Sequence, residues 1–175
     1  MPDRLVVDTN VLIAASSADP THPKDIDATP EDPALRMRVW SWLKTFRESD
    51  DRLVLDLEQK IFEEYRNKLG FNDFGIQVVM HKWSTCAVDD VGVAYDQNGH
   101  GVLPDPLSPV IHDLDDRKMV AACLEAIRLY NDCRIAFAGD TDWHDWEAAL
   151  VEYGVSLLPI IEDWSRQRHA EKKAR

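Results

Sequence analysis

Two kinds of segment alternate along the chain. The first is a short apolar run, which is typical of a strand buried on both faces of a parallel sheet. Such runs lie at residues 4–7, 53–55, 134–138 and 155–158. The second kind has apolar residues at helical spacing, which predicts an amphipathic helix. These stretches lie at residues 34–48, 57–69, 74–87, 116–127 and 143–153. The alternation predicts an α/β fold with a central parallel sheet and helices on both faces.

Three segments lack this regularity. Residues 19–33 hold four prolines and predict a loop. Residues 88–112 have three prolines and no clear periodicity, and they predict either an insertion with a function or a mobile lid. Residues 166–175 are basic and poor in apolar side chains, which predicts a frayed or disordered tail. Since the chain has no internal repeat, we expect one domain over residues 1–165, with an insertion at about 71–112.

Composition favours a folded protein. The 175 residues are 45% hydrophobic and include six tryptophans. This composition argues against a wholly disordered protein, because disordered chains have low hydrophobicity. No apolar run approaches the roughly 20 residues that cross a bilayer, and the start lacks a basic-then-apolar signal segment. We therefore expect a cytoplasmic protein without a membrane partner.

The charge of the chain restricts its partners. The formal net charge is −12 at pH 7, whereas nucleic-acid binding is usually driven by Lys and Arg side chains that displace phosphate counterions. Two interpretations remain open. Either the ligand is not a polyanion, or part of the acidity forms a metal site and the basic residues gather elsewhere.

Four acidic residues stand where a site of an α/β protein is expected. Asp8 ends the first strand, and Asp140 follows the strand at 134–138. Asp116 lies in the first turn of a helix, and Glu64 flanks the buried side of another. Ligands of open α/β sheets bind outside the carboxyl ends of the strands, so these acids can converge there.

A convergence of carboxylates requires compensation. Two carboxylates about 4 Å apart repel by roughly 4 kcal/mol at an effective dielectric constant near 20, so a cluster needs protons or cations. Ligands that are all oxygen suit Mg²⁺ or Mn²⁺, which also equip a protein for in-line attack of water on a phosphodiester.

Each acid also has an ordinary structural interpretation. Asp116 could serve as a helix cap, although Asp113 and Asp115 are better placed for that role. Glu64 could be a solvated flank. Asp8 is harder to explain structurally, because a charge that ends a buried strand is costly unless it is paired or bound to a metal.

Four segments around these acids carry a resemblance to a known family. They are Val-Val-Asp-Thr-Asn-Val-Leu-Ile at 6–13, Glu-Glu-Tyr-Arg-Asn-Lys-Leu at 63–69, Asp-Leu-Asp-Asp-Arg-Lys-Met-Val at 113–120, and Ala-Gly-Asp-Thr-Asp at 138–142. In this order they resemble the four acidic motifs of the PIN-domain family, which includes ribonuclease toxins of prokaryotes and RNA-processing nucleases. The resemblance covers roughly residues 4–70 and 113–160.

The resemblance implies a three-layer Rossmann-like fold and an endoribonuclease that uses Mg²⁺ or Mn²⁺. The implied metal ligands and catalytic acids are Asp8, Glu64, Asp116 and Asp140, with Asp142 as an auxiliary ligand and Thr9, Asn10 and Thr141 in support. The implied substrate is single-stranded or structured RNA. A toxin with an antitoxin protein as its partner and a housekeeping nuclease both remain open, and a homodimer is a further expectation.

Two departures from the family pattern keep other functions open. Ala138 stands where the fourth motif usually has a hydroxyl residue, and residues 71–112 match less well. With the acidic surface, Ala138 favours an alternative, a catalytically weak or inactive PIN scaffold that binds a protein partner. A phosphohydrolase of small phosphate esters ranks last, because the motif Asp-x-Asp-x-Thr occurs only at residues 25–29, in the proline-rich segment predicted as a loop and not after a predicted strand.

Five further side chains near the motifs have two interpretations each. His144 could contact a phosphate or a metal, or lie half-exposed on its helix. Arg117 and Lys118 could attract phosphate or be solvated charges. Trp143 and Trp146 could stack on bases, but membership of the core is the favoured interpretation.

Overall fold

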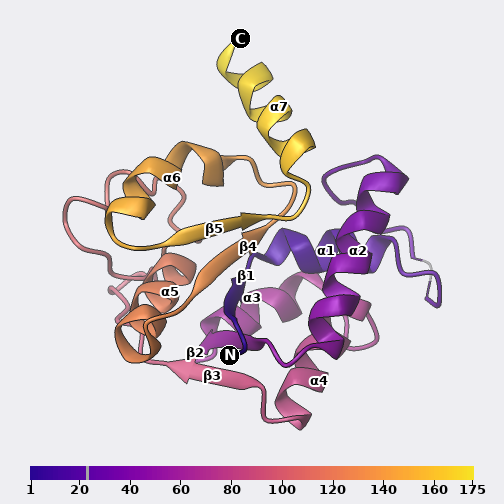
Figure 1. Ribbon diagram of the computed structural model, residues 1–175, viewed down its shortest axis with the longest axis horizontal. Helices are drawn as coiled ribbons and strands as arrows, with labels where there is room; N and C mark the ends of the chain where they lie inside the picture. Colours follow the sequence, from indigo (N-terminus) through magenta and orange to yellow (C-terminus); the bar gives the residue numbers. More distant parts are fainter. Residues whose placement is uncertain (23) are drawn as a thin grey trace.

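A computed structural model describes residues 1–22 and 24–175 (Figure 1). Within these residues the chain forms five strands and seven helices, in the order β1 (Arg4–Val7), α1 (Thr9–Ser17), α2 (Pro33–Glu48), β2 (Arg52–Asp56), α3 (Lys60–Lys68), α4 (Phe74–Ser84), β3 (Val88–Val91), α5 (Arg117–Tyr130), β4 (Arg134–Phe137), α6 (Asp142–Glu152), β5 (Ser156–Pro159) and α7 (Glu162–Lys173). None of the described helices combines the length and apolar content needed to cross a bilayer.

The strands form one sheet in the order β3-β2-β1-β4-β5, and every neighbouring pair is parallel. Helices α1, α2 and α4 pack together on one side of the sheet, and α5 and α6 lie on the other (Figure 1). The central strands are apolar because both of their faces are covered: Val6, Val54 and Ile135 are all completely buried. The predicted α/β fold with a parallel sheet between helical layers is confirmed.

The strand order creates a crevice at one position. From β1 the chain crosses to β2 on one side, whereas β4 and β5 lie on the other side of β1. The connections that follow β1 and β4 therefore run in opposite directions, and a crevice opens between them at the carboxyl ends of these two strands. Open α/β sheets bind ligands in such a crevice. The ends of β1 and β4 are therefore the expected position of a site.

Apart from the C-terminal helix α7, two elements were not predicted. Helix α1 is apolar on most of its surface because it lies between other elements, so it shows little helical periodicity. Strand β3 falls in the segment 88–112, which the sequence predicted as irregular. Its central residues are Asp89 and Asp90, which strands usually avoid. Asp89 is accommodated because two arginines donate to its carboxylate. Arg4 does so with Nε at 2.8 Å, and Arg52 with Nε and Nη2, both at 2.8 Å.

The prediction of a frayed tail at residues 166–175 is wrong. Helix α7 continues to Lys173 and is attached to α6 by charged pairs. Arg166 binds Glu147 at 3.2 Å, and Lys173 binds Asp145 at 3.0 Å. The loop predicted at 19–33 is confirmed as far as Asp32, where α2 is capped, except for Pro23, which lies outside the described residues.

The rest of the segment 88–112 has a defined course. Tyr95 and Gly101 form an antiparallel bridge, and Asp96 closes the turn between them by accepting the N–H groups of Asn98 and His100. The Tyr95 hydroxyl donates to Asp56 at the end of β2. The turn at 95–101, one part of the segment predicted as an insertion, is thus fixed to the sheet.

Gly101 allows this turn to lie against α5. A Cβ atom at Gly101 would lie 2.7 Å from the backbone nitrogen and Cα of Lys118, too close for any side chain. Gly101→Ala should therefore lower the free energy of unfolding by about 1–3 kcal/mol, the usual cost of overpacking. Gly92→Ala is the matched control, because a Cβ there meets nothing within 4 Å; it should change stability by less than about 1 kcal/mol. Urea unfolding of both variants measures the difference, and equal effects would contradict the tight approach.

Candidate metal centre

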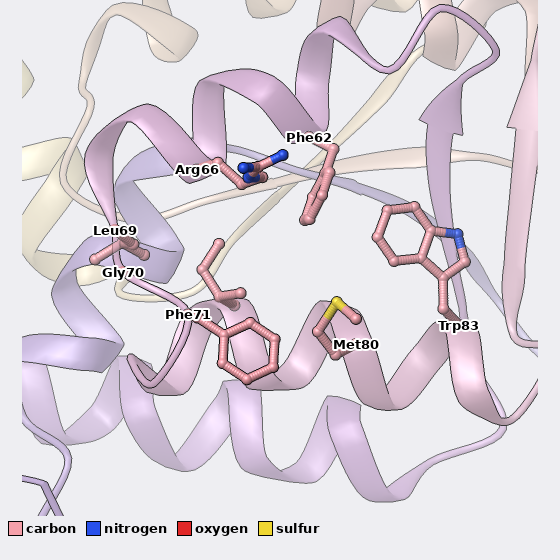
Figure 2. Close-up of a pocket in the computed structure, with 8 residues that line it drawn as sticks. Phe62, Arg66, Leu69, Gly70, Phe71, Met80 and Trp83 are labelled. Carbon is pink, nitrogen blue, oxygen red and sulfur yellow. The ribbon is translucent and has the colours of Figure 1, made fainter.

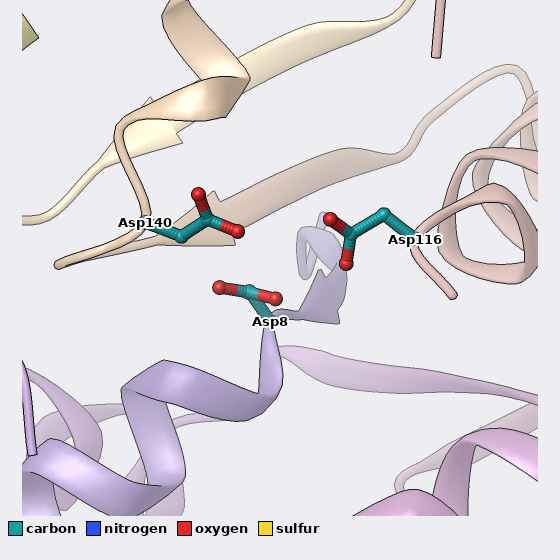
Figure 3. A group of neighbouring side chains, drawn as sticks. All are labelled: Asp8, Asp116 and Asp140. Atoms are coloured by element: carbon teal, nitrogen blue, oxygen red, sulfur yellow. The ribbon is translucent and has the colours of Figure 1, made fainter. Parts of the chain in front are cut away.

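Three aspartates meet at the carboxyl ends of β1 and β4. Asp8, Asp116 and Asp140 each offer a carboxylate oxygen, and these oxygens all lie within 4.8 Å of one another (Figure 3). Asp8 follows β1, Asp140 follows β4, and Asp116 immediately precedes α5. Only 4% of Asp8 and 8% of Asp116 is exposed, and Asp140 is half-buried. The carboxylates are close enough to share one cation.

Backbone contacts hold two of these aspartates in place. The Asp8 N–H donates to the Ala136 carbonyl at 2.9 Å, which continues the pairing of β1 with β4. The Asn10 side chain then binds both flanks of the crevice: its oxygen accepts from the Gly139 N–H at 2.7 Å, and its nitrogen donates to the Thr29 carbonyl at 2.9 Å. Any Cβ at Gly139 would collide with Thr29. Asn10 thus braces the turn that carries Asp140.

Burial and the charges of neighbouring carboxylates raise the pKa of all three carboxyl groups. Burial is the largest cause for each of them. Together with the charges of Asp8 and Asp140 it raises the pKa of Asp116 to about 10. The pKa of Asp8 is raised well above its ordinary value, with Asp140 and then Glu64 adding to burial. A group in this condition takes up protons or a cation at neutral pH.

Several polar atoms at this position have no hydrogen-bond partner among the described residues. They are Oδ2 of Asp8, Oδ2 of Asp116, Oγ1 of Thr141 and Nε1 of Trp143. The Trp143 indole lowers the pKa of Asp8, so it lies toward that carboxylate, although it makes no hydrogen bond of ordinary geometry. A buried polar atom without a partner costs about 1–3 kcal/mol, and more if it is charged. The aspartate oxygens therefore fit a bound cation, which would supply the missing partner.

Glu64 lies beside the three aspartates but outside their group. One carboxylate oxygen accepts from the Thr9 hydroxyl, and the other forms an ion pair with Lys118 Nζ at 2.8 Å. Its charge still raises the pKa of Asp8 and of Asp116. Of the four acids expected to converge, three share one position, and the fourth is held next to them by Thr9 and Lys118.

Asp142 and Thr141 follow Asp140 at the start of α6. The Asp142 backbone N–H donates to Oδ1 of Asp140 at 3.0 Å and so orients that carboxylate. The Asp142 side chain is not in the aspartate group, and its Oδ1 lies 4.0 Å from Lys172 Nζ. The auxiliary contribution of Asp142 in this structure is therefore made by its backbone.

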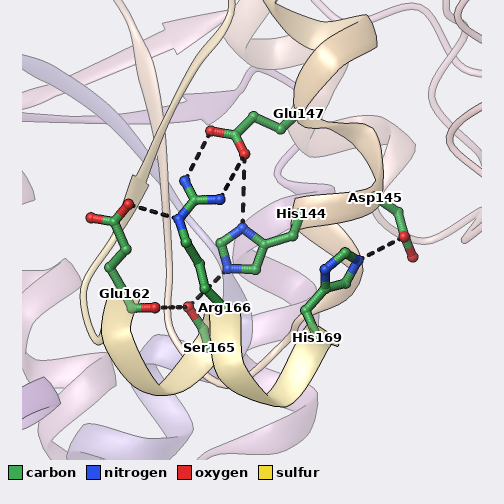
Figure 4. Close-up of polar contacts among 7 residues, drawn as sticks. All are labelled: His144, Asp145, Glu147, Glu162, Ser165, Arg166 and His169. Carbon is green, nitrogen blue, oxygen red and sulfur yellow. Dashed lines mark hydrogen bonds and ion pairs between the residues drawn. The ribbon is translucent and has the colours of Figure 1, made fainter. Parts of the chain in front are cut away.

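Other candidates from the sequence serve the fold. His144 lies between α6 and α7, where its Nε2 is 2.9 Å from the hydroxyl of the buried Ser165 (Figure 4). Arg117 donates to the carbonyls of Ser108 and Ile111. Trp143 and Trp146 are both buried, as the core interpretation predicted.

Sequence reasoning missed Asp56, a completely buried acid at the end of β2. Its two oxygens accept the N–H groups of Lys60 and Ile61 and the hydroxyl of Tyr95, so it caps α3 and fixes the 95–101 turn. The signal was present in the sequence, because Asp56 ends an apolar strand as Asp8 does. Full hydrogen bonding distinguishes Asp56 from Asp8.

A cavity of about 470 Å³ between α3 and α4 is separate from this centre (Figure 2). Its walls are mainly apolar and include Phe62, Phe71, Met80 and Trp83. No carboxylate lines it. The apolar cavity and the candidate chemistry therefore occupy different parts of the molecule.

Comparisons with protein-family models, with curated proteins and with solved structures found no match.

The raised pKa of Asp116 has a measurable consequence. Its folded pKa of about 10 exceeds the ordinary aspartate value, so the folded state holds an extra proton between about pH 4 and pH 10. Without metal, the free energy of unfolding should fall as pH rises through this window, by up to about 1.4 kcal/mol per pH unit. Asp116→Asn should flatten this decline and stabilise the metal-free protein at high pH, by no more than a few kcal/mol.

Urea unfolding in EDTA at about pH 5, 7 and 9 measures this effect. Asp115→Asn, at the exposed neighbouring position, is the control with the same loss of charge. If both variants keep the pH slope of the original protein, Asp116 is not the group that binds the extra proton.

Proposed function

We propose that this protein is a cytoplasmic, PIN-like endoribonuclease that requires Mg²⁺ or Mn²⁺. The observation that carries the proposal is the pair of buried, unpartnered oxygens on Asp8 and Asp116, close to the carboxylate of Asp140. Mg²⁺ and Mn²⁺ prefer oxygen ligands of this kind. The three aspartates lie where open α/β sheets bind ligands, at the switch between β1 and β4.

In such a centre, some residues would bind the metal and others would orient the metal ligands. Asp8, Asp116 and Asp140 would hold the metal, and the Asp142 N–H keeps the Asp140 carboxylate turned toward it. A bound divalent cation would supply an activated water and neutralise charge on the phosphodiester. Glu64 is held at the rim by Thr9 and Lys118, and the lone pairs that these two contacts leave on its oxygens would orient a water or a second ion.

The choice of RNA as substrate rests on the four motifs. Their acids, Asp8, Glu64, Asp116 and Asp140, come from four separate segments and lie at one edge of the sheet or directly beside it. This placement supports the resemblance to PIN nucleases. An antitoxin protein and a second copy of the chain stay predicted partners, since neither the motifs nor the site distinguishes a toxin from a housekeeping enzyme.

A second candidate is a catalytically weak PIN scaffold. It is favoured by Ala138, which is completely buried and offers no hydroxyl near Asp140, and by Glu64, whose carboxylate is already engaged. Such a protein would bind the metal and fail to cleave. Metal binding and RNA cleavage distinguish these candidates when each is measured separately.

Metal binding should stabilise the fold. A cation that binds only the folded state at a hundred times its dissociation constant adds about 2.7 kcal/mol. For a chain of this size that corresponds to an increase in melting temperature of roughly 5–11 °C. We expect Mn²⁺ or Mg²⁺ to produce this increase, and EDTA to reverse it, in a thermal melt. An unchanged melting temperature throughout a metal titration would exclude the centre.

Cleavage should depend on Asp8. Removing a partner in the outer shell of a metal site typically costs about 10–100-fold in affinity or activity, so loss of a direct ligand should cost at least about a hundredfold. We expect the original protein to cleave labelled single-stranded RNA with Mn²⁺, and Asp8→Asn to lose this activity. Asp105→Asn removes the same charge from an exposed loop and should cleave normally. Metal-dependent stabilisation without cleavage would favour the scaffold.

A further inference from the structure

A polar cavity of about 420 Å³ opens beside the aspartates. Its walls come from α3, from the turn at 96–100 and from the residues around the start of α5. This volume lies in the range of roughly 300–1,000 Å³ that is typical of small-ligand sites. Unlike the apolar cavity between α3 and α4, it shares residues with the candidate centre: Glu64 and Lys118 line it, and Asp115 precedes Asp116.

Three lysines face this cavity. Lys60 and Lys68 are eight residues apart on α3, so they lie on one side of the helix with Glu64 between them. Among the residues that the structure describes, neither Lys60 nor Lys68 forms an ion pair. Lys118 is buried and uses two of its three N–H bonds, on Glu64 and on the Asp115 carbonyl, which leaves one donor.

Three carboxylates also line the cavity, and their effect must be weighed. Glu64 is compensated by Lys118 at 2.8 Å. Glu63 and Asp115 are exposed, so their charges are largely screened by water and salt. The cavity is therefore close to neutral in a chain of net charge −12, and a divalent cation on the adjacent aspartates would make it attractive to anions.

The walls of the cavity are fixed before any ligand binds. Asp56 binds the first N–H groups of α3 and the Tyr95 hydroxyl, so it ties α3 to the turn that follows Tyr95. The turn is closed by Asp96 and lies against Lys118 through Gly101. A site that is already formed loses less entropy when it binds, which favours affinity.

We infer that this cavity is the subsite for the nucleotide next to the scissile phosphodiester, and that it binds the phosphate and ribose of that nucleotide. The inference rests on the proposed nuclease function. Lys60 and Lys68 bind the phosphate, and the amides of Asn67 and Asn98, which also line the cavity, are free for the ribose. Among the described residues no aromatic side chain lines the cavity, so they provide no platform for base stacking. Recognition here is independent of base sequence.

Salt dependence tests the subsite. Each phosphate contact on a single strand contributes about 0.7 to the slope of log affinity against log salt, so two contacts contribute about 1.4. Between about 1 M and 0.1 M salt this corresponds to roughly 25-fold in affinity. We expect a variant with Lys60→Gln and Lys68→Gln to lose this slope and this affinity. The probe is a fluorescein-labelled single-stranded RNA of mixed sequence, with binding followed by anisotropy in Ca²⁺.

A variant with Lys44→Gln and Arg47→Gln is the matched control. It removes the same charge at the other end of the sheet, where the neighbouring Thr45 lines a cavity with Arg134, the first residue of β4. The control should keep the slope and stay within about twofold of the original affinity. Equal losses in both variants would overturn the inference, since only the overall charge would then matter. Absence of RNA binding by the original protein would also overturn it.

Cleavage with Mn²⁺ is measured separately, so that the two proposals fail in different ways. If the original protein cleaves RNA and the Lys60 and Lys68 substitutions leave binding unchanged, the subsite is wrong and the nuclease stands. If these substitutions abolish salt-dependent binding while the original protein never cleaves, the strand-binding cavity stands and the nuclease is wrong.

Discussion

Negative charge held away from water is the constraint on which this structure depends. Asp8 and Asp116 are buried, their charges add to that of Asp140, and no hydrogen bond satisfies their second oxygens within the described residues. A fold tolerates such an arrangement only if the surrounding backbone fixes it firmly. The parallel pairing of β1 with β4 provides this, because it delivers two of the three aspartates to one edge.

Residues around the three aspartates fix the position of their carboxylates without neutralising the charge. Asn10 joins the loop at Thr29 to the turn at Gly139, which prevents the carboxylates from moving apart. Lys118 sits within the acidic region, yet it pairs with Glu64 and leaves the aspartates uncompensated. Asp56, at the end of the adjacent strand, has every oxygen satisfied. The contrast is between Asp8, which keeps one oxygen without a partner among the described residues, and Asp56, whose oxygens all stabilise the fold.

Local sequence patterns predicted those parts of the molecule that depend on local physics. The runs before Asp8 and Asp140 identified β1 and β4, and strand ends are where parallel sheets bind ligands. The order of the strands could not be predicted from the sequence, because strand pairing joins segments that can be more than a hundred residues apart, such as those of Leu5 and Arg134. Helix α7 was missed for a different reason: its order comes from charged pairs with the preceding helix α6, such as Arg166 with Glu147, which its own composition does not reveal. The position of Glu64 likewise depends on Lys118, far along the chain.

The two outer strands determine how this molecule can meet its own copies. Strand β3 carries the exposed Asp90 at one edge of the sheet, and β5 ends the other edge with Pro159, which has no N–H to donate. Charge and proline are the usual means by which sheets resist extension and aggregation. Growth of the sheet across molecules is thus disfavoured on both sides. The sheet edges therefore leave only the helical layers as a surface through which a second copy would associate.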